Sequence, residues 1–247
     1  MRKGKITLVG AGPGDPELIT VKGLKAIQSA DVILFDALLD PNLMDKIPEK
    51  VTKIFVGKRA DNHAYTQTEI NKLLVKYGRE KKQVIRLKGG DPFILGRGHE
   101  EIEYAKGQGI ETEVIPGLSS ATALAALHGI PLTKRGVTPG FIVISAVNSD
   151  GLLNHDLHDL VKTTLTLVIL MGLSRLPEIC AIYESANKNK MSIYIIQNGS
   201  LLNEKSVGGT IETIQKKVEQ AGITTPAVII IGEVVSLRTN PGLSHGQ

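Results

Sequence analysis

Several residue types are scarce in this sequence, and each scarcity excludes a class of structure. The 247 residues include one cysteine, Cys180, and no tryptophan. A lone cysteine cannot form an intramolecular disulfide or a cysteine metal cluster, which is typical of a reducing compartment. No apolar run approaches the roughly 18 residues that span a bilayer, and the N-terminus lacks the apolar core of a signal peptide. We therefore expect a cytoplasmic protein without a membrane partner.

Nucleic-acid binding and metal catalysis are also disfavoured. The formal net charge is only +4, with four Phe and five Tyr in the whole chain, and no run of basic residues exceeds two. The six histidines show no H-E-x-x-H or comparable spacing, so no metal site is predicted. The modest positive charge is compatible with a small acidic substrate.

Short β-branched or apolar runs alternate with amphipathic segments, which is typical of parallel sheets covered by helices. Strands are predicted at Ile6–Val9, Val32–Phe35, Lys53–Val56, Val84–Leu87, Glu113–Ile115, Phe141–Ser145, Leu165–Met171, Ser192–Ile196 and Ala227–Val235. Helices are predicted at Thr66–Tyr77, Asp156–Val161, Ser174–Ala186 and Ile211–Ala221.

The segment Pro131–Gly140, with two prolines and two glycines, has the composition of an interdomain linker. Gly199–Thr210 is expected to add a hairpin or a bulged edge. The fold prediction is therefore α/β with two domains, an N-terminal one over 1–132 and a C-terminal one over 133–247.

Two glycine clusters follow predicted strands. The first, Gly10–Pro16, is spaced G-x-G-x-G with a proline inside, and Asp15-Pro16 starts a turn where a dinucleotide fingerprint needs a helix. A nicotinamide-dependent dehydrogenase is therefore a weak alternative to a simple tight turn. The second, Arg86–Phe93, is followed by a Gly-Arg-Gly triplet, and its glycines allow a ligand to approach the backbone closely. Asp91 either binds a ligand or caps the turn.

A carboxylate and two cations also follow predicted strands. Asp36 ends the second strand, and Lys58 and Arg59 follow the third. Because the carboxyl ends of parallel strands share one edge, these groups can meet there. A carboxylate beside cations can move a proton while a guanidinium holds an anion, although a solvated surface pair would look the same in the sequence.

These motifs occur in one order that resembles uroporphyrinogen-III C-methyltransferases. The matching segments are Val9–Pro16, Gly57–Arg59, Arg86–Phe93, Gly96–Gly98, Pro116–Ala121 and Gly129–Thr133. The resemblance spans about residues 6–237 and implies a two-domain class III methyltransferase fold with its site in the interdomain cleft. It also implies a homodimer that uses S-adenosylmethionine, without a metal, to methylate C2 and C7 of uroporphyrinogen III, giving precorrin-2 for sirohaem or cobalamin synthesis.

The resemblance also assigns site residues. Asp36 matches a proton acceptor and Lys58 a proton donor, with Arg59 steering a substrate carboxylate. Because the substrate carries eight carboxylates, Lys134 and Arg135 are further candidate clamps. The residues implied as contacts of S-adenosylmethionine are Pro13, Gly89, Gly90, Asp91, Ile94, Ser119, Ser120, Met171 and Gly199.

The second domain departs from the family pattern. Ser145-Ala146-Val147 stands where Thr-Gly-His is usual, Leu170 where tyrosine is usual, and Lys134 where histidine is usual. These changes leave two alternatives: another precorrin or tetrapyrrole methylase, or a non-catalytic protein of the same fold that binds S-adenosylmethionine.

Overall fold

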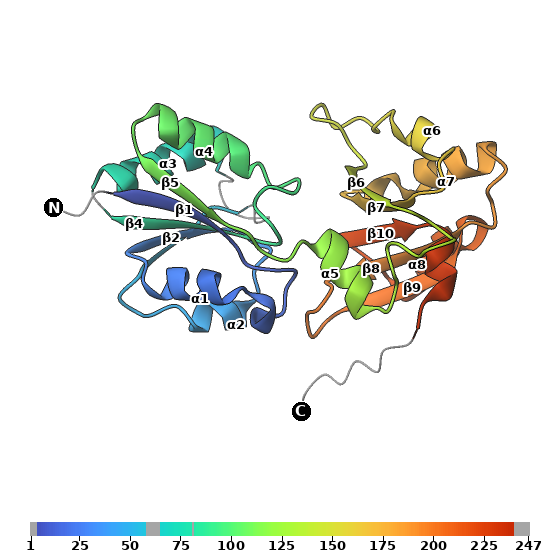
Figure 1. Cartoon of the computed structure of the whole chain (residues 1–247), viewed down its shortest axis with the longest axis horizontal. Coiled ribbons are helices and arrows are strands. Elements are labelled where there is room, and N and C mark those ends of the chain that lie inside the picture. Colours follow the sequence, from blue (N-terminus) through green and yellow to red (C-terminus); the bar gives the residue numbers. More distant parts are fainter. Residues whose placement is uncertain (1–3, 58–64, 81, 240–247) are drawn as a thin grey trace. The chain divides into compact units, whose positions relative to one another are not determined.

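The computed structural model describes residues 4–57, 65–80 and 82–239, which form the two compact units drawn in Figure 1. The first unit ends at Ser119 and the second begins at Ser120. The boundary lies earlier than the predicted 132/133 because helix α5 (Ser120–Leu127) packs on strands of the second sheet.

The first unit is a five-stranded parallel sheet in the order β3-β2-β4-β1-β5. Helices α1 and α2 lie on one face of the sheet, and α3 and α4 lie on the other (Figure 1). Its elements are β1 (Lys5–Gly10), a 3₁₀ turn η1 (Pro16–Leu18), α1 (Val21–Gln28), β2 (Val32–Phe35), α2 (Pro41–Asp45), β3 (Thr52–Phe55), α3 (Gln67–Arg79), β4 (Gln83–Lys88), α4 (Gly98–Gly107) and β5 (Glu111–Ile115).

Alternation along the strands divides the apolar side chains between the two faces. Ile6 and Leu8 of β1 pack with the α3 side chains Ile70 and Leu74, whereas Val9 packs with Ile27 of α1. Both faces of the sheet are therefore buried, as the continuous apolar runs predicted.

The predicted helix Thr66–Tyr77 is confirmed, and it begins as its sequence requires. Thr66 caps α3, and the side chain of Glu69 accepts a hydrogen bond from the Thr66 amide at 2.7 Å. This capping box satisfies two backbone donors that helix geometry leaves free. On the face of α3 that packs on the sheet, Ile70 and Leu74 are buried.

The second unit is a mixed five-stranded sheet in the order β6-β7-β10-β8-β9, with only β6 and β7 paired in parallel. Side chains of α6, α7 and α8 pack on one face, and those of α5 and η3 pack on the other. The remaining elements are β6 (Phe141–Ser145), α6 (Leu157–Leu160), β7 (Thr166–Leu170), η2 (Leu173–Arg175), α7 (Leu176–Ser185), β8 (Ser192–Gln197), β9 (Lys205–Thr210), α8 (Ile211–Ala221), β10 (Ala227–Ile231) and η3 (Glu233–Leu237).

Two sequence predictions for this unit have different outcomes. The expected edge element within Gly199–Thr210 is confirmed, since β9 pairs antiparallel with β8. The expected linker Pro131–Gly140 instead lies inside the second unit, where Lys134 and Thr138 exchange two backbone hydrogen bonds of 3.1 and 3.0 Å. It is a tight turn within the second unit rather than a connection between units.

Among the described residues, no helix combines the length and apolarity needed to cross a membrane.

Cys180 gives a test of the second core. It is fully buried between α7 and the sheet, and burial raises the pKa of its thiol to about 11. We expect no reaction with a thiol-specific reagent at pH 8 in the folded protein and full reaction after unfolding in guanidinium. Because the unfolded thiol loses its proton near pH 9.0, the thiol's contribution to stability is lost as pH rises from about 9 to 11. Rapid labelling of the folded chain at pH 8 would contradict this packing.

Candidate active site

Three loops meet at the carboxyl edge of the first sheet. Gly12 and Gly90 form an antiparallel bridge, in which the Gly90 amide donates to the Gly12 carbonyl at 2.7 Å. A Cβ built on Gly10 or Gly117 would lie 2.6 or 2.4 Å from the Gly90 carbonyl oxygen, closer than side-chain carbons tolerate. The loops after β1, β4 and β5 therefore cross backbone to backbone, which only glycine permits.

Asp91 joins two of these loops. One carboxylate oxygen accepts a hydrogen bond from the Phe93 amide at 2.8 Å, and the other accepts from the Gly117 amide at 3.1 Å. The turn-capping interpretation of Asp91 is thus confirmed. Its proposed contact with a cofactor would use the remaining lone pairs of the same two oxygens.

The loop from Asp91 to Gly98 winds around the carbonyl of Pro92, which accepts a hydrogen bond from the Gly98 amide at 2.9 Å. Leu95 and Arg97 have φ of 53° and 57°, in the left-handed region that non-glycine residues rarely adopt. Ile94 is 40% exposed between two similarly exposed apolar side chains. Strained backbone and exposed apolar groups beside a glycine crossing are features of a ligand site.

Arg97 is a charged side chain of this loop, and it pairs with Glu100. Its guanidinium makes a two-point contact with Glu100, with distances of 2.9 and 2.6 Å. The hydrogen bonds from Arg97 lower the pKa of Glu100, and those to Glu100 raise the pKa of Arg97. Both side chains are exposed, so this pair is ionised at the surface of the edge.

Asp36 lies at the carboxyl end of β2, as predicted. One of its oxygens accepts from the Leu38 amide at 3.2 Å, and the other lies 3.5 Å from Nη2 of Arg86. Its side chain is 22% exposed. The Leu38 amide and Arg86 therefore hold the Asp36 carboxylate, which is still partly exposed to solvent.

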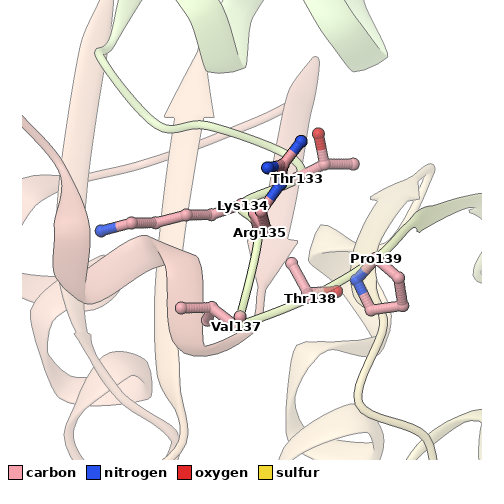
Figure 2. Close-up of a pocket in the computed structure, with 7 residues that line it drawn as sticks. Thr133, Lys134, Arg135, Val137, Thr138 and Pro139 are labelled. Atoms are coloured by element: carbon pink, nitrogen blue, oxygen red, sulfur yellow. The ribbon is translucent and has the colours of Figure 1, made fainter.

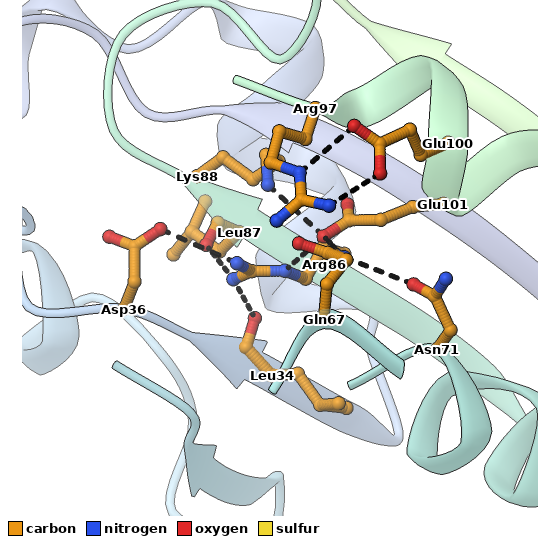
Figure 3. Close-up of polar contacts among 10 residues, drawn as sticks. All are labelled: Leu34, Asp36, Gln67, Asn71, Arg86, Leu87, Lys88, Arg97, Glu100 and Glu101. Atoms are coloured by element: carbon orange, nitrogen blue, oxygen red, sulfur yellow. Dashed lines mark hydrogen bonds and ion pairs between the residues drawn. The ribbon is translucent and has the colours of Figure 1, made fainter. Parts of the chain in front are cut away.

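Behind Asp36 lies a buried charged cluster, formed by Arg86, Lys88 and Glu101 (Figure 3). One Glu101 oxygen lies 3.2 Å from Nε of Arg86 and 3.1 Å from Nζ of Lys88, and it also accepts from Gln67 at 3.0 Å. The other Glu101 oxygen makes no hydrogen bond with the described residues. Burial lowers the pKa of Lys88, repulsion from Arg86 lowers it further, and the Glu101 charge opposes both.

The second unit places two predicted cofactor residues at one edge of its sheet. Met171 follows β7 and Gly199 follows β8, and both strands run antiparallel to β10 between them. Met171 is 53% exposed with φ of 54°, and Asn198 and Ser200 on either side of Gly199 also have positive φ. The Leu124 side chain fills the space where a Cβ at position 199 would stand.

The 133–139 turn lines a hollow of about 400 Å³ in the second unit (Figure 2). The Lys134 side chain extends away from the turn, whereas Arg135 lies beside Thr133. Two cations at one turn give an anion two separate points of contact.

The structure brings some predicted residues together, whereas others belong to the second unit or lie outside the described residues. Pro13 follows the Gly12–Gly90 bridge, so it lies near Gly89, Gly90 and Asp91. Ser119 is buried at the end of the first unit, and Ser120 begins α5 in the second. Lys58 and Arg59, the predicted proton donor and carboxylate clamp, lie outside the described residues.

The candidate site residues predicted from the sequence did not include the Arg86–Lys88–Glu101 cluster. The sequence of β4 nevertheless indicates its two cations. Val84, Arg86 and Lys88 alternate along β4 and so share one face of a central strand. Two cations on a buried face require an anion, but nothing in the strand indicates that it comes from the first turn of α4.

Comparison with known proteins identifies the family. Residues 5–215 match the family Tetrapyrrole (Corrin/Porphyrin) Methylases. The uroporphyrinogen-III C-methyltransferase of Methanocaldococcus jannaschii is 43% identical over 237 residues, covering 95% of this chain and 98% of the relative. The siroheme synthase of Methylobacillus flagellatus is 42% identical over 240 residues, covering 96% of this chain but 51% of the relative. The chain thus spans about half the length of the siroheme synthases it matches.

Solved structures agree with this assignment. A uroporphyrin-III C-methyltransferase from Thermus thermophilus, complexed with S-adenosylhomocysteine, has a TM-score of 0.81 at 35% identity, covering 95% of this chain and all of that chain. A cobalt precorrin-4 methyltransferase has a TM-score of 0.83 at 27% identity, covering 94% of this chain and 95% of the other. The chain belongs to the tetrapyrrole methylases and has their α/β fold.

The glycine crossing yields a stability prediction. Gly117→Ala is expected to lower the free energy of unfolding by about 2 kcal/mol or more, because its Cβ meets two rigid backbone segments. The matched control is Gly107→Ala at the end of α4, where a Cβ meets nothing within 4 Å. That variant should be neutral or more stable by up to about 1 kcal/mol. Equal urea midpoints for the two variants would show that the crossing tolerates a side chain.

Proposed function

We propose that this chain is a uroporphyrinogen-III C-methyltransferase that uses S-adenosylmethionine to methylate C2 and C7, giving precorrin-2 for sirohaem or cobalamin synthesis. The observation that carries the proposal is the glycine crossing at the carboxyl edge of the first sheet, in a chain 43% identical to a methyltransferase that it covers almost completely.

The described residues fit the proposed cofactor. Gly89 and Gly90 offer backbone without side chains, so a ligand can lie against the end of β4. The partly exposed side chains of Ile94 and Met171 offer apolar surface to an adenine ring. Ser119, Ser120, Pro13, Asp91 and Gly199 complete the proposed set of contacts. S-adenosylmethionine supplies the methyl group from its sulfonium, and the chemistry proposed here requires no metal from the protein.

The protein's own chemical task is then small. A porphyrinogen pyrrole carbon is already electron-rich, so the site must hold it in line with the methyl donor and accept the proton released afterwards. We assign proton acceptance to Asp36, whose carboxylate reaches solvent while Arg86 lies against it. Lys58 is the proposed proton donor, and Arg59 the proposed clamp for a substrate carboxylate.

Substrate recognition is proposed to use further cations. Lys134 and Arg135 line the hollow of Figure 2, where they can hold carboxylates of a substrate that carries eight. A homodimer and a cytoplasmic location are part of the same proposal. Light scattering tests the dimer. The single buried thiol of Cys180 supports the location, because it fits a reducing compartment.

An anaerobic incubation with S-adenosylmethionine and enzymatically generated uroporphyrinogen III tests the activity. The expected result is release of S-adenosylhomocysteine together with a tetrapyrrole heavier by two methyl groups. A gain at another ring position would favour a different tetrapyrrole methylase, an alternative supported by the likeness to the cobalt precorrin-4 enzyme. Cofactor binding without any transfer would leave a non-catalytic protein of the same fold.

Asp36→Asn separates turnover from cofactor binding. We expect kcat to fall by about 100-fold, a typical loss for a general base, because the amide cannot accept the proton. The dissociation constant of S-adenosylhomocysteine, measured by calorimetry, should stay within about threefold, since Asp36 is not among the proposed cofactor contacts. Asp45→Asn on the exposed surface of α2 is the matched control. A large loss of cofactor affinity in Asp36→Asn would contradict the assigned role.

A further inference from the structure

We infer that Arg86 is a positioning residue for the reaction: it fixes the Asp36 carboxylate at the substrate edge and is itself fixed by buried Glu101. The inference rests on the proposed function through the role of Asp36. Arg86 lies between the two carboxylates (Figure 3) and is almost completely buried, whereas Asp36 is partly exposed.

Every nitrogen of the Arg86 guanidinium has a partner. Nε donates to Glu101 at 3.2 Å, and Nη1 donates to the carbonyls of Leu34 and Leu87 at 3.4 and 3.0 Å. Nη2 is left to face Asp36 at 3.5 Å. Because the guanidinium is planar and rigid, the three contacts of Nε and Nη1 determine where the third nitrogen, Nη2, points. Lysine, with one rotatable charged nitrogen, cannot reproduce this arrangement.

The backbone partners place the guanidinium between neighbouring strands. Leu34 lies in β2, two residues before Asp36, and Leu87 lies in β4, next to Arg86 itself. Arg86 therefore links the strand that carries Asp36 to the strand that leads into the glycine loop. Among the described residues, it is the one side chain within ion-pair distance of Asp36.

The charge balance of the cluster determines which variant can test this idea. Replacing Arg86 leaves Lys88 and Glu101 as a neutral buried pair 3.1 Å apart. Replacing Glu101 instead leaves two buried cations without their shared anion, a change that typically costs about 3–5 kcal/mol. Arg86→Gln is therefore the variant to use. Arg86→Lys, which keeps the charge but loses the fork, provides a second variant if the first fails to fold.

Two measurements on these variants separate positioning from general structural damage. Crystal structures report where the Asp36 carboxylate lies, whether or not the reaction occurs. Anaerobic kinetics are compared for Arg86→Gln, Asp36→Asn and the double variant. Arg79→Gln is the matched control, because Arg79 makes an exposed contact with Gln108 in the same unit.

The inference gives a definite pattern of results. In the Arg86→Gln and Arg86→Lys crystals, Asp36 should leave its present position. In solution, kcat should fall about 10- to 100-fold, as expected when a reacting group is misplaced, while KM and the affinity for S-adenosylhomocysteine stay within about threefold. In the Asp36→Asn background, Arg86→Gln should change kcat by less than about twofold, because the effects of coupled residues do not add.

Other results would overturn the inference. An Asp36 carboxylate that keeps its place in both variants would show that Arg86 does not position it. Losses of kcat that multiply in the double variant would show that Arg86 acts independently of Asp36. If the wild-type chain transfers no methyl group, the proposed function fails, and the crystal structures still decide whether Arg86 holds Asp36.

Discussion

The arrangement of the carboxyl edge of the first sheet depends on one buried carboxylate. Glu101 is the shared ion-pair partner of both cations that β4 carries on its buried face, Arg86 and Lys88. Without it, two positive charges would lie in an apolar layer between sheet and helices, a change that typically costs about 3–5 kcal/mol. Through Glu101, the position of α4 is tied to β4, and through Arg86 to the end of β2, where Asp36 lies.

The carboxyl edge of the first sheet combines two structural features with separate roles. The crossing of Gly10, Gly90 and Gly117 forms a rigid surface of backbone where a cofactor can lie close to the strands. In the charged cluster, Arg86 lies 3.5 Å from the Asp36 carboxylate at the end of β2 (Figure 3). Methyl transfer to an electron-rich carbon needs alignment and a proton acceptor more than strong electrophilic assistance. In the proposed reaction, the glycine surface supports the alignment and Asp36 accepts the proton.

The sequence predicted what local rules control and missed what distant partners decide. The helix that starts at Thr66 and the strands predicted at Ile6–Val9 and Val32–Phe35 followed from pattern alone. Glu101 was missed because its partners lie in another element, 13 and 15 residues away. The proline- and glycine-rich segment at 131–140 suggested a linker, but the same composition also suits a tight turn, and only packing distinguishes the two.

The glycine crossing of the first sheet is the proposed position of the cofactor. The most direct measurement is a crystal structure of this chain with S-adenosylhomocysteine bound. We expect ligand contacts with the backbone of Gly89, Gly90 and Asp91 at the end of β4. Ligand bound elsewhere, with these three residues untouched, would show that the crossing is not the cofactor site.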